Sequence, residues 1–94
     1  SKEALKDLEN IWTYTFEKWS VEQADKYLKL IFNEIDFLLV NPAAGQNYSE
    51  VKKGYFRARV QSHFIFYKVN IKESALEVVR ILHQRMDIPN HLGG

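Results

Sequence analysis

The feature that most constrains the fold is the second half of the chain, residues 54–86, in which β-forming runs alternate with short polar turns. Branched and aromatic side chains dominate each run, and their alternation with polar ones is typical of half-buried strands. The predicted strands span residues 55–61, 63–69 and 75–84. Because the connections are short, neighbouring strands pair as hairpins, and we expect an antiparallel sheet of three or more strands.

The first half of the chain carries a helical periodicity instead. The two predicted helices span residues 2–19 and 21–40. Ser1 and Ser20 are the expected N-caps, and Gln23 completes a capping box with Ser20. Pro42 disfavours helical geometry at Asn41 and therefore ends the second helix. Since the connection is so short, the helices form an antiparallel hairpin that covers one face of the sheet, which makes an α+β fold.

Apolar side chains mark the expected buried stripe of each helix. The first stripe comprises Leu5, Leu8, Trp12, Thr15 and Trp19. The second comprises Ala24, Leu28, Ile31, Ile35 and Leu38. We expect the aromatic cluster of Trp12, Phe16 and Trp19 to belong to the core rather than to a ligand cage.

The length of 94 residues suits a single domain with one core, which we assign to residues 1–94. The chain has no cysteine, which fits a reducing compartment, and no apolar run long enough to span a membrane. A cytoplasmic location is therefore expected. Residues 1–41 carry a net charge of −3 and residues 42–94 one of +4, a polarity that favours an oriented partner.

A two-residue turn at Gln61-Ser62 fixes the register of the first hairpin and puts arginines and phenylalanines on the sheet face away from the helices. Pairing Ile65 with Ile81 adds a third arginine to that far face. The predicted far face carries Arg57, Arg59, Phe64, Phe66 and Arg80. The predicted face under the helices includes Phe56, Ala58, Ile65 and Tyr67.

Three interpretations of this far face remain open from the residues alone. It suits single-stranded nucleic acid, an acidic amphipathic peptide, or no partner at all. Catalysis has little support, because no carboxylate stands at a telling distance from His83 along the chain. The spacing of His63, His83 and His91 is not that of a metal site, and no glycine-rich nucleotide motif is present, so no metal or cofactor is expected.

Six segments in a fixed order resemble one known family. They are Ala4-x-x-Asp7-Leu8-x-x-Ile11-Trp12-x-Tyr14-Thr15, Trp19-Ser20-x-x-Gln23-Ala24, Asn41-Pro42-x-x-Gly45, Gly54-Tyr55-x-Arg57, Ser62-His63-x-Ile65-Phe66-Tyr67 and Val79-Arg80-Ile81-Leu82-His83-x-x-Met86-Asp87. Together they resemble the ParE branch of the RelE/ParE toxin superfamily of bacterial toxin–antitoxin systems. The resemblance implies a RelE/ParE-like fold with a short strand ahead of the helical hairpin, and that strand is expected before Ser1.

The resemblance also implies a function. ParE-type toxins are described as inhibitors of DNA gyrase that act by binding and are neutralised by a ParD-type antitoxin in a hetero-oligomer. The first alternative is a ribosome-dependent mRNA interferase, an endoribonuclease. Phe64 and Gln84 stand where the interferases place polar catalytic groups, so we expect no catalytic residue and no direct sequence-specific binding of nucleic acid. The second alternative is an inactive remnant that only binds the antitoxin.

Two groups of site residues follow. The candidates for antitoxin binding are Arg57, Arg59, Phe64, Phe66 and Arg80. The candidates for gyrase binding are His83, Arg85 and Met86, at the exit from the last strand. Pro89 is expected to stop further regular structure. The exit segment of residues 83–92 then either contacts the target or packs over the helices through Met86, Ile88 and Leu92.

Overall fold

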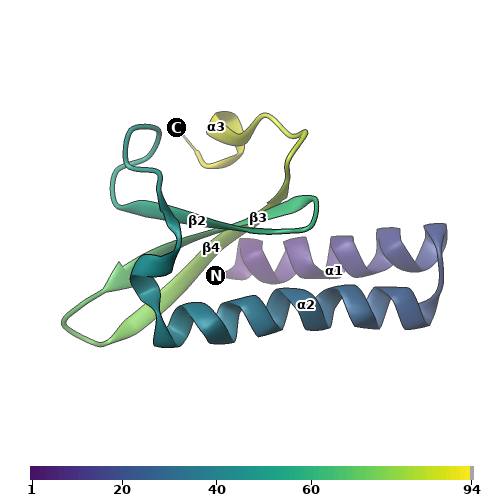
Figure 1. The fold of residues 1–94 in the computed structure, drawn as a ribbon. Coiled ribbons are helices and arrows are strands. Elements are labelled where there is room, and N and C mark those ends of the chain that lie inside the picture. Colours follow the sequence, from purple (N-terminus) through teal and green to yellow (C-terminus); the bar gives the residue numbers. More distant parts are fainter. Residues whose placement is uncertain (94) are drawn as a thin grey trace.

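Two helices form one layer of the molecule, and their serine caps are the predicted ones. The computed structural model describes residues 1–93. The helices are α1 (Lys2–Lys18) and α2 (Val21–Val40). The hydroxyl of Ser1 accepts a hydrogen bond from the Ala4 amide, and that of Ser20 accepts one from the Gln23 amide. Figure 1 shows the two helices antiparallel beneath the sheet.

A four-stranded antiparallel sheet forms the second layer, in the order β1-β2-β3-β4. The strands are β1 (Gln46–Asn47), β2 (Tyr55–Val60), β3 (His63–Asn70) and β4 (Ala75–His83). The predicted α+β class is confirmed, and each predicted helix or strand ends within one residue of its expected bounds. The short strand β1 was not predicted, because two residues are too few to show a period.

Two further short helices flank the sheet. They are the 3₁₀ turn η1 (Pro42–Ala44) and the helix α3 (Ile88–His91). The expectation that Pro89 stops regular structure is wrong, because proline is tolerated in the first turn of a helix, where its missing N–H has no partner to lose. α3 lies on the opposite side of the sheet from α1 and α2 (Figure 1).

The register of the first hairpin is also the predicted one. Val60 pairs with His63 across a two-residue turn, in which Gln61 adopts the left-handed conformation with φ of 53°. The predicted cross-strand pairs are all present: Phe56 with Tyr67, Arg57 with Phe66, Ala58 with Ile65, and Arg59 with Phe64.

The second hairpin contains an irregularity that simple alternation does not predict. Ile65 pairs with Ile81 as expected, but a shift between Phe66 and Tyr67 sets Tyr67 opposite Val78. In a regular strand Val78 and Ile81, three positions apart, would point to opposite faces of the sheet. Because of the shift, both pack under the helices.

The larger core lies between the helices and the sheet. It consists of Ile11, Ile31, Leu38, Ala58, Val60, Ile65, Tyr67 and Ile81. Tyr67 is fully buried, and its hydroxyl donates to the Pro42 carbonyl and accepts from the Gly45 amide. A Cβ on Gly45 would stand 2.1 Å from that hydroxyl, so only glycine fits there.

A smaller second core covers the other face of the sheet. It consists of Tyr55, Phe66, Leu82, Ile88 and Leu92. The exit segment therefore packs over the far face of the sheet, and the alternative that it packs over the helices is wrong. The expectation that Phe66 lies on an open surface is also wrong, because this segment leaves it fully buried.

The buried stripe predicted for α2 is confirmed, because all of its residues are buried or packed against the core. The buried stripe predicted for α1 is partly wrong. α1 buries Ala4 and Ile11, whereas Leu5 and Trp19 are 62% and 68% exposed. The reason is that α1 runs beside the outer strand β4 rather than over the middle of the sheet, so it buries only a narrow stripe. Trp12 stacks on Phe16 at the surface instead of entering the core.

No helix within residues 1–93 is both long and apolar enough to cross a membrane.

A candidate binding pocket between the first helix and the exit of the sheet

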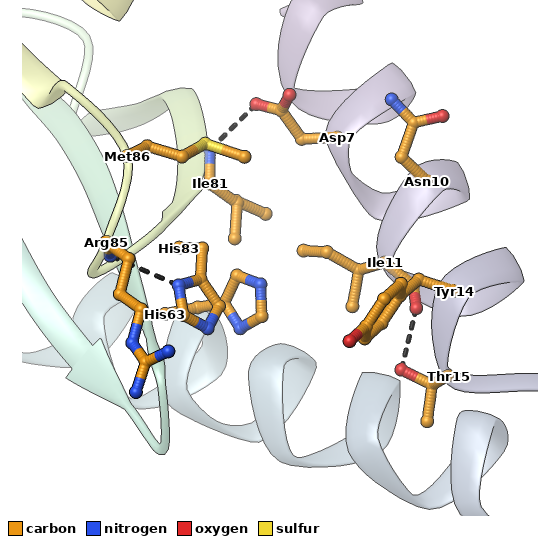
Figure 2. Close-up of a pocket in the computed structure, with 10 residues that line it drawn as sticks. All are labelled: Asp7, Asn10, Ile11, Tyr14, Thr15, His63, Ile81, His83, Arg85 and Met86. Carbon is orange, nitrogen blue, oxygen red and sulfur yellow. Dashed lines mark hydrogen bonds between the residues drawn. The ribbon is translucent and has the colours of Figure 1, made fainter. Parts of the chain in front are cut away.

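A pocket opens where α1 passes the ends of β3 and β4. Its volume is about 490 Å³. It is lined by Asp7, Asn10, Ile11, Tyr14, Thr15, His63, Ile81, His83, Arg85 and Met86. Figure 2 shows the side chains of α1 on one side of the space and the two imidazole rings on the other. All three candidates for target binding, His83, Arg85 and Met86, are thus brought together at one site.

Two histidines form the floor of the pocket because they are cross-strand partners at the open end of the sheet. The rings of His63 and His83 meet edge to face, with centres 5.1 Å apart. The hydroxyl of Tyr27, on α2, lies 2.6 Å from Nδ1 of His63. Burial, reinforced by the neighbouring His83, lowers the pKa of His63 to about 4, so this ring is neutral near pH 7.

The tautomer of His83 follows from the exit segment. Its Nδ1 accepts a hydrogen bond from the Arg85 amide at 3.1 Å, which Figure 2 shows as a dashed line. A neutral His83 therefore carries its proton on Nε2. Arg85 and Met86 follow directly, and both side chains are exposed at the rim of the pocket. Ile11 and Ile81 line the pocket beside the two imidazole rings, and the basic side chain of Arg85 stands at its rim.

Asp7 holds α1 against the edge of the sheet at the other end of the pocket. Its carboxylate accepts two hydrogen bonds from Arg80, at 2.8 and 2.9 Å, and a third from the Ile81 amide at 2.9 Å. Hydrogen bonding to Asp7 raises the pKa of the Arg80 guanidinium above its ordinary value. Arg80 also donates to the His91 carbonyl, so one guanidinium joins α1, β4 and α3.

Four of the five candidates for antitoxin binding lie away from this pocket, and Arg80 bonds to Asp7 at its end. Arg57 and Arg59 project from β2 on the far face, and Phe64 is half-buried beside them. Phe66 lies beneath the exit segment, and Arg80 is turned toward Asp7 at the edge of the sheet. Only Arg57, Arg59 and part of Phe64 therefore face solvent together.

Sequence reasoning missed the α1 side of the pocket and His63. A useful indication was present in Asp7, which is four positions from Ile11 and therefore on the same face of the helix. An acidic side chain at a buried helical position indicates an ion pair. Within residues 1–93, no cluster of three or more potential metal-binding side chains is present.

Two N-terminal helices on a four-stranded antiparallel sheet make an α+β fold of the RelE/ParE type. Comparison with known proteins then identifies the family. Residues 1–88 match the model of the "ParE toxin of type II toxin-antitoxin system, parDE". The chain belongs to the ParE toxin family.

Curated relatives agree over nearly the whole chain. The chain is 40% identical to Toxin ParE1 of Mycobacterium tuberculosis over 92 residues, covering 98% of this chain and 93% of that protein. It is 38% identical to Toxin ParE1 of Caulobacter vibrioides, covering 99% and 94%. Toxin ParE of Escherichia coli is 33% identical, with 96% and 86% covered.

Proposed function

We propose that this ParE family member inhibits bacterial DNA gyrase by binding it in the cytoplasm through the pocket at the exit of the sheet. The observation that carries the proposal is the convergence of His83, Arg85 and Met86 on one cavity. Ile11 and Ile81 offer apolar contacts to an anchoring side chain of the target. The exposed Arg85 at the rim suits an acidic group beside that anchor.

The internal bonding of the histidines supports binding over catalysis. Nδ1 of His63 is engaged by Tyr27, and Nδ1 of His83 is engaged by the Arg85 amide. A pKa of about 4 makes His63 a poor general base or acid near pH 7, because catalytic groups work best with pKa values near the working pH. The ring of His63 is therefore held by α2, and only that of His83 bonds to the exit segment.

We also propose a ParD-type antitoxin as the second partner, in a hetero-oligomeric complex. Arg57 and Arg59 suit its acidic side chains, and Phe64 lies between them. Large exposed apolar side chains on α1 and α2, such as Leu5 and Phe32, suit the apolar face of the same segment. Phe66 and Arg80 support this surface from within rather than contact the partner.

Supercoiling by purified gyrase in the presence of the purified chain tests the first proposal. We expect the wild type to inhibit supercoiling and to accumulate cleaved DNA. Arg85→Ala with Met86→Ala should raise the concentration needed for half inhibition by at least about tenfold, as loss of anchor residues does. The matched control is Ile71→Ala with Lys72→Ala, which removes one exposed apolar and one exposed basic side chain from the β3–β4 turn.

Equal loss of inhibition in both double variants would refute the pocket as the contact. Growth arrest by an intact chain that leaves supercoiling unchanged would refute gyrase as the target. The antitoxin proposal is tested separately, by measuring the affinity of Arg57→Glu with Arg59→Glu for the partner antitoxin at low and high salt. Unchanged affinity at both would exclude this face.

A further inference from the structure

In both imidazole rings of the pocket, one ring nitrogen is already engaged as an acceptor. The hydroxyl of Tyr27 lies 2.6 Å from Nδ1 of His63 but 3.4 Å from the Val60 carbonyl, so it donates its proton to the imidazole. Nδ1 of His83 accepts from the Arg85 amide at 3.1 Å. Each ring therefore carries its own proton on Nε2.

Neither of these Nε2–H groups has a partner within the protein. Within residues 1–93 both rings are bonded only through Nδ1, and no side-chain nitrogen or oxygen is both buried and without a hydrogen-bond partner. Solvent therefore reaches Nε2 of His63 and Nε2 of His83. The two residues are cross-strand partners, and Figure 2 shows both rings at the border of the open space. Two free donors side by side select a hydrogen-bond acceptor as the ligand of the pocket.

The charges around the rings favour an anionic acceptor. Asp7 lines the pocket, but its carboxylate is paired with Arg80 and already accepts three hydrogen bonds. The guanidinium of Arg85, at the rim, makes neither an ion pair nor a hydrogen bond within residues 1–93. One positive charge is thus left uncompensated beside the two donors, and it favours one negative charge on the ligand.

The remaining walls favour a carboxylate on an apolar stem. Ile11, Ile81 and Met86 line the same space, whose volume of about 490 Å³ far exceeds that of a carboxylate alone. Ligand pockets of this kind are filled by an apolar body whose few polar groups meet fixed partners. Inorganic phosphate has no apolar part, and a phosphate ester carries a charge of about −1.5 to −2, more than the single arginine offsets.

We propose that the pocket is a carboxylate-binding site, in which the Nε2–H groups of His63 and His83 hold the carboxylate of an acidic side chain of the target. The apolar stem of that side chain packs on Ile11 and Ile81. The choice of a target side chain as the occupant rests on the proposed function. The donors and the charge that define the carboxylate site are present whatever the target is.

NMR of the chain labelled with ¹⁵N-histidine tests the site without gyrase. Near neutral pH, both His63 and His83 should appear as the tautomer with the proton on Nε2. Titration with 4-phenylbutyrate should shift both Nε2 signals, with a dissociation constant on the order of 1 mM for a ligand of this size, and leave those of His91 unchanged. The uncharged amide, 4-phenylbutyramide, should bind at least about tenfold more weakly, because it lacks the charge. The amine, 4-phenylbutylamine, and inorganic phosphate should not shift the two signals.

Asparagine variants remove the donors one at a time. An asparagine places its side-chain oxygen near the position of Nδ1, so His63→Asn and His83→Asn retain an acceptor for Tyr27 and for the Arg85 amide but lose Nε2–H. Each should weaken 4-phenylbutyrate binding about fivefold, and the double variant about 25-fold, whereas His91→Asn is the matched control and should change it less than about twofold. Thermal melting checks the fold of each variant, and His83→Asn, at the more accessible end of the strand pair, decides the question if the double variant does not fold.

The outcomes separate the site from its proposed occupant. A proton on Nδ1 of either ring, equal affinity for the amide, or tighter binding of the amine or of phosphate would overturn the carboxylate site. In the supercoiling assay, 4-phenylbutyrate at about ten times its dissociation constant should raise the concentration of the chain needed for half inhibition about tenfold, with the amide as the control for effects on gyrase itself. Unchanged inhibition would overturn an acidic side chain of the target as the occupant. A chain that does not inhibit supercoiling at all would refute the proposed function, while the NMR titration still decides the carboxylate site.

Discussion

Replacing Asp7 by alanine should cost more stability than any other substitution of an acidic residue in α1. Asp7 accepts three hydrogen bonds, two from Arg80 and one from the Ile81 amide, and its side chain is only 11% exposed. Its removal leaves a partly buried guanidinium and a backbone N–H without their acceptor. An unsatisfied buried donor costs about 1–3 kcal/mol, and breaking a fully buried ion pair about 3–5 kcal/mol.

The ion pair here is only partly buried, because Arg80 is 22% exposed, so we expect a loss of about 2–4 kcal/mol for Asp7→Ala. Asp7→Asn retains one oxygen acceptor and should lose about 1–2 kcal/mol. The matched control is Asp25→Ala, which removes a single exposed hydrogen bond from the indole of Trp12 and should cost at most about 1 kcal/mol.

Urea unfolding followed by tryptophan fluorescence measures these differences, with circular dichroism as a second probe of two-state behaviour. A double-mutant cycle with Arg80→Ala should give a coupling free energy of about 1–3 kcal/mol between the two side chains. A loss below about 0.5 kcal/mol for Asp7→Ala, or a coupling free energy near zero, would show that the contact contributes nothing to the attachment of α1.

Three further outcomes are expected. Gly45→Ala should destabilise the fold by about 2–4 kcal/mol, because the added Cβ displaces the Tyr67 hydroxyl from both of its hydrogen-bond partners. The loss in free energy of unfolding, measured with urea, should be smaller in a Tyr67→Phe background. An equal loss in that background would contradict the contact. The free energy of unfolding should decrease as the pH falls from about 6.5 to about 4, because the unfolded chain binds a proton at His63 that the folded chain excludes. The decrease is at most about 3 kcal/mol, and the partial exposure of His63 reduces it to about 1–2 kcal/mol. This pH dependence should vanish in His63→Gln and persist in the control His91→Gln. Translating ribosomes incubated with the chain should show no new message ends, and codon-specific cuts that disappear in His83→Ala would instead favour the mRNA interferase.

Most of the fold could be predicted because local pattern and tertiary structure agree along most of the chain. The hairpin at Gln61-Ser62 has a register that one two-residue turn determines, so its cross-strand pairs follow directly. The stripe of α2 crosses the sheet, and its helical period therefore reports its burial. α1 lies at the edge of the sheet, where Asp7 takes the place of a buried apolar side chain. The helical period of its apolar residues therefore predicts a buried face that is one position too late in the sequence: Leu5 and Trp12 instead of Ala4 and Ile11.

The candidate site was only half predictable. His83, Arg85 and Met86 lie within four positions of one another, so the sequence alone suggests a common site. Asp7, Tyr14 and His63 are distant in the sequence, and only tertiary packing brings them to the pocket. The burial of Phe66 depends on α3, a helix of four residues with Pro89 in its first turn, and so short a helix leaves no periodic pattern in the sequence.

The pocket joins the two ends of the described chain, and this affects when it is completed during synthesis. Asp7 and Arg80 are 73 positions apart, and the pocket also needs Met86. A ribosome adds roughly 5–20 residues per second, so the helical hairpin waits several seconds after its own synthesis before β4 reaches it. During that interval α1 and α2 have no sheet to cover, and the nascent chain has no pocket. A ribosome-bound chain that stops short of residue 86 is therefore expected to be harmless to the target, and a partner that recognises the finished pocket discriminates complete chains from incomplete ones.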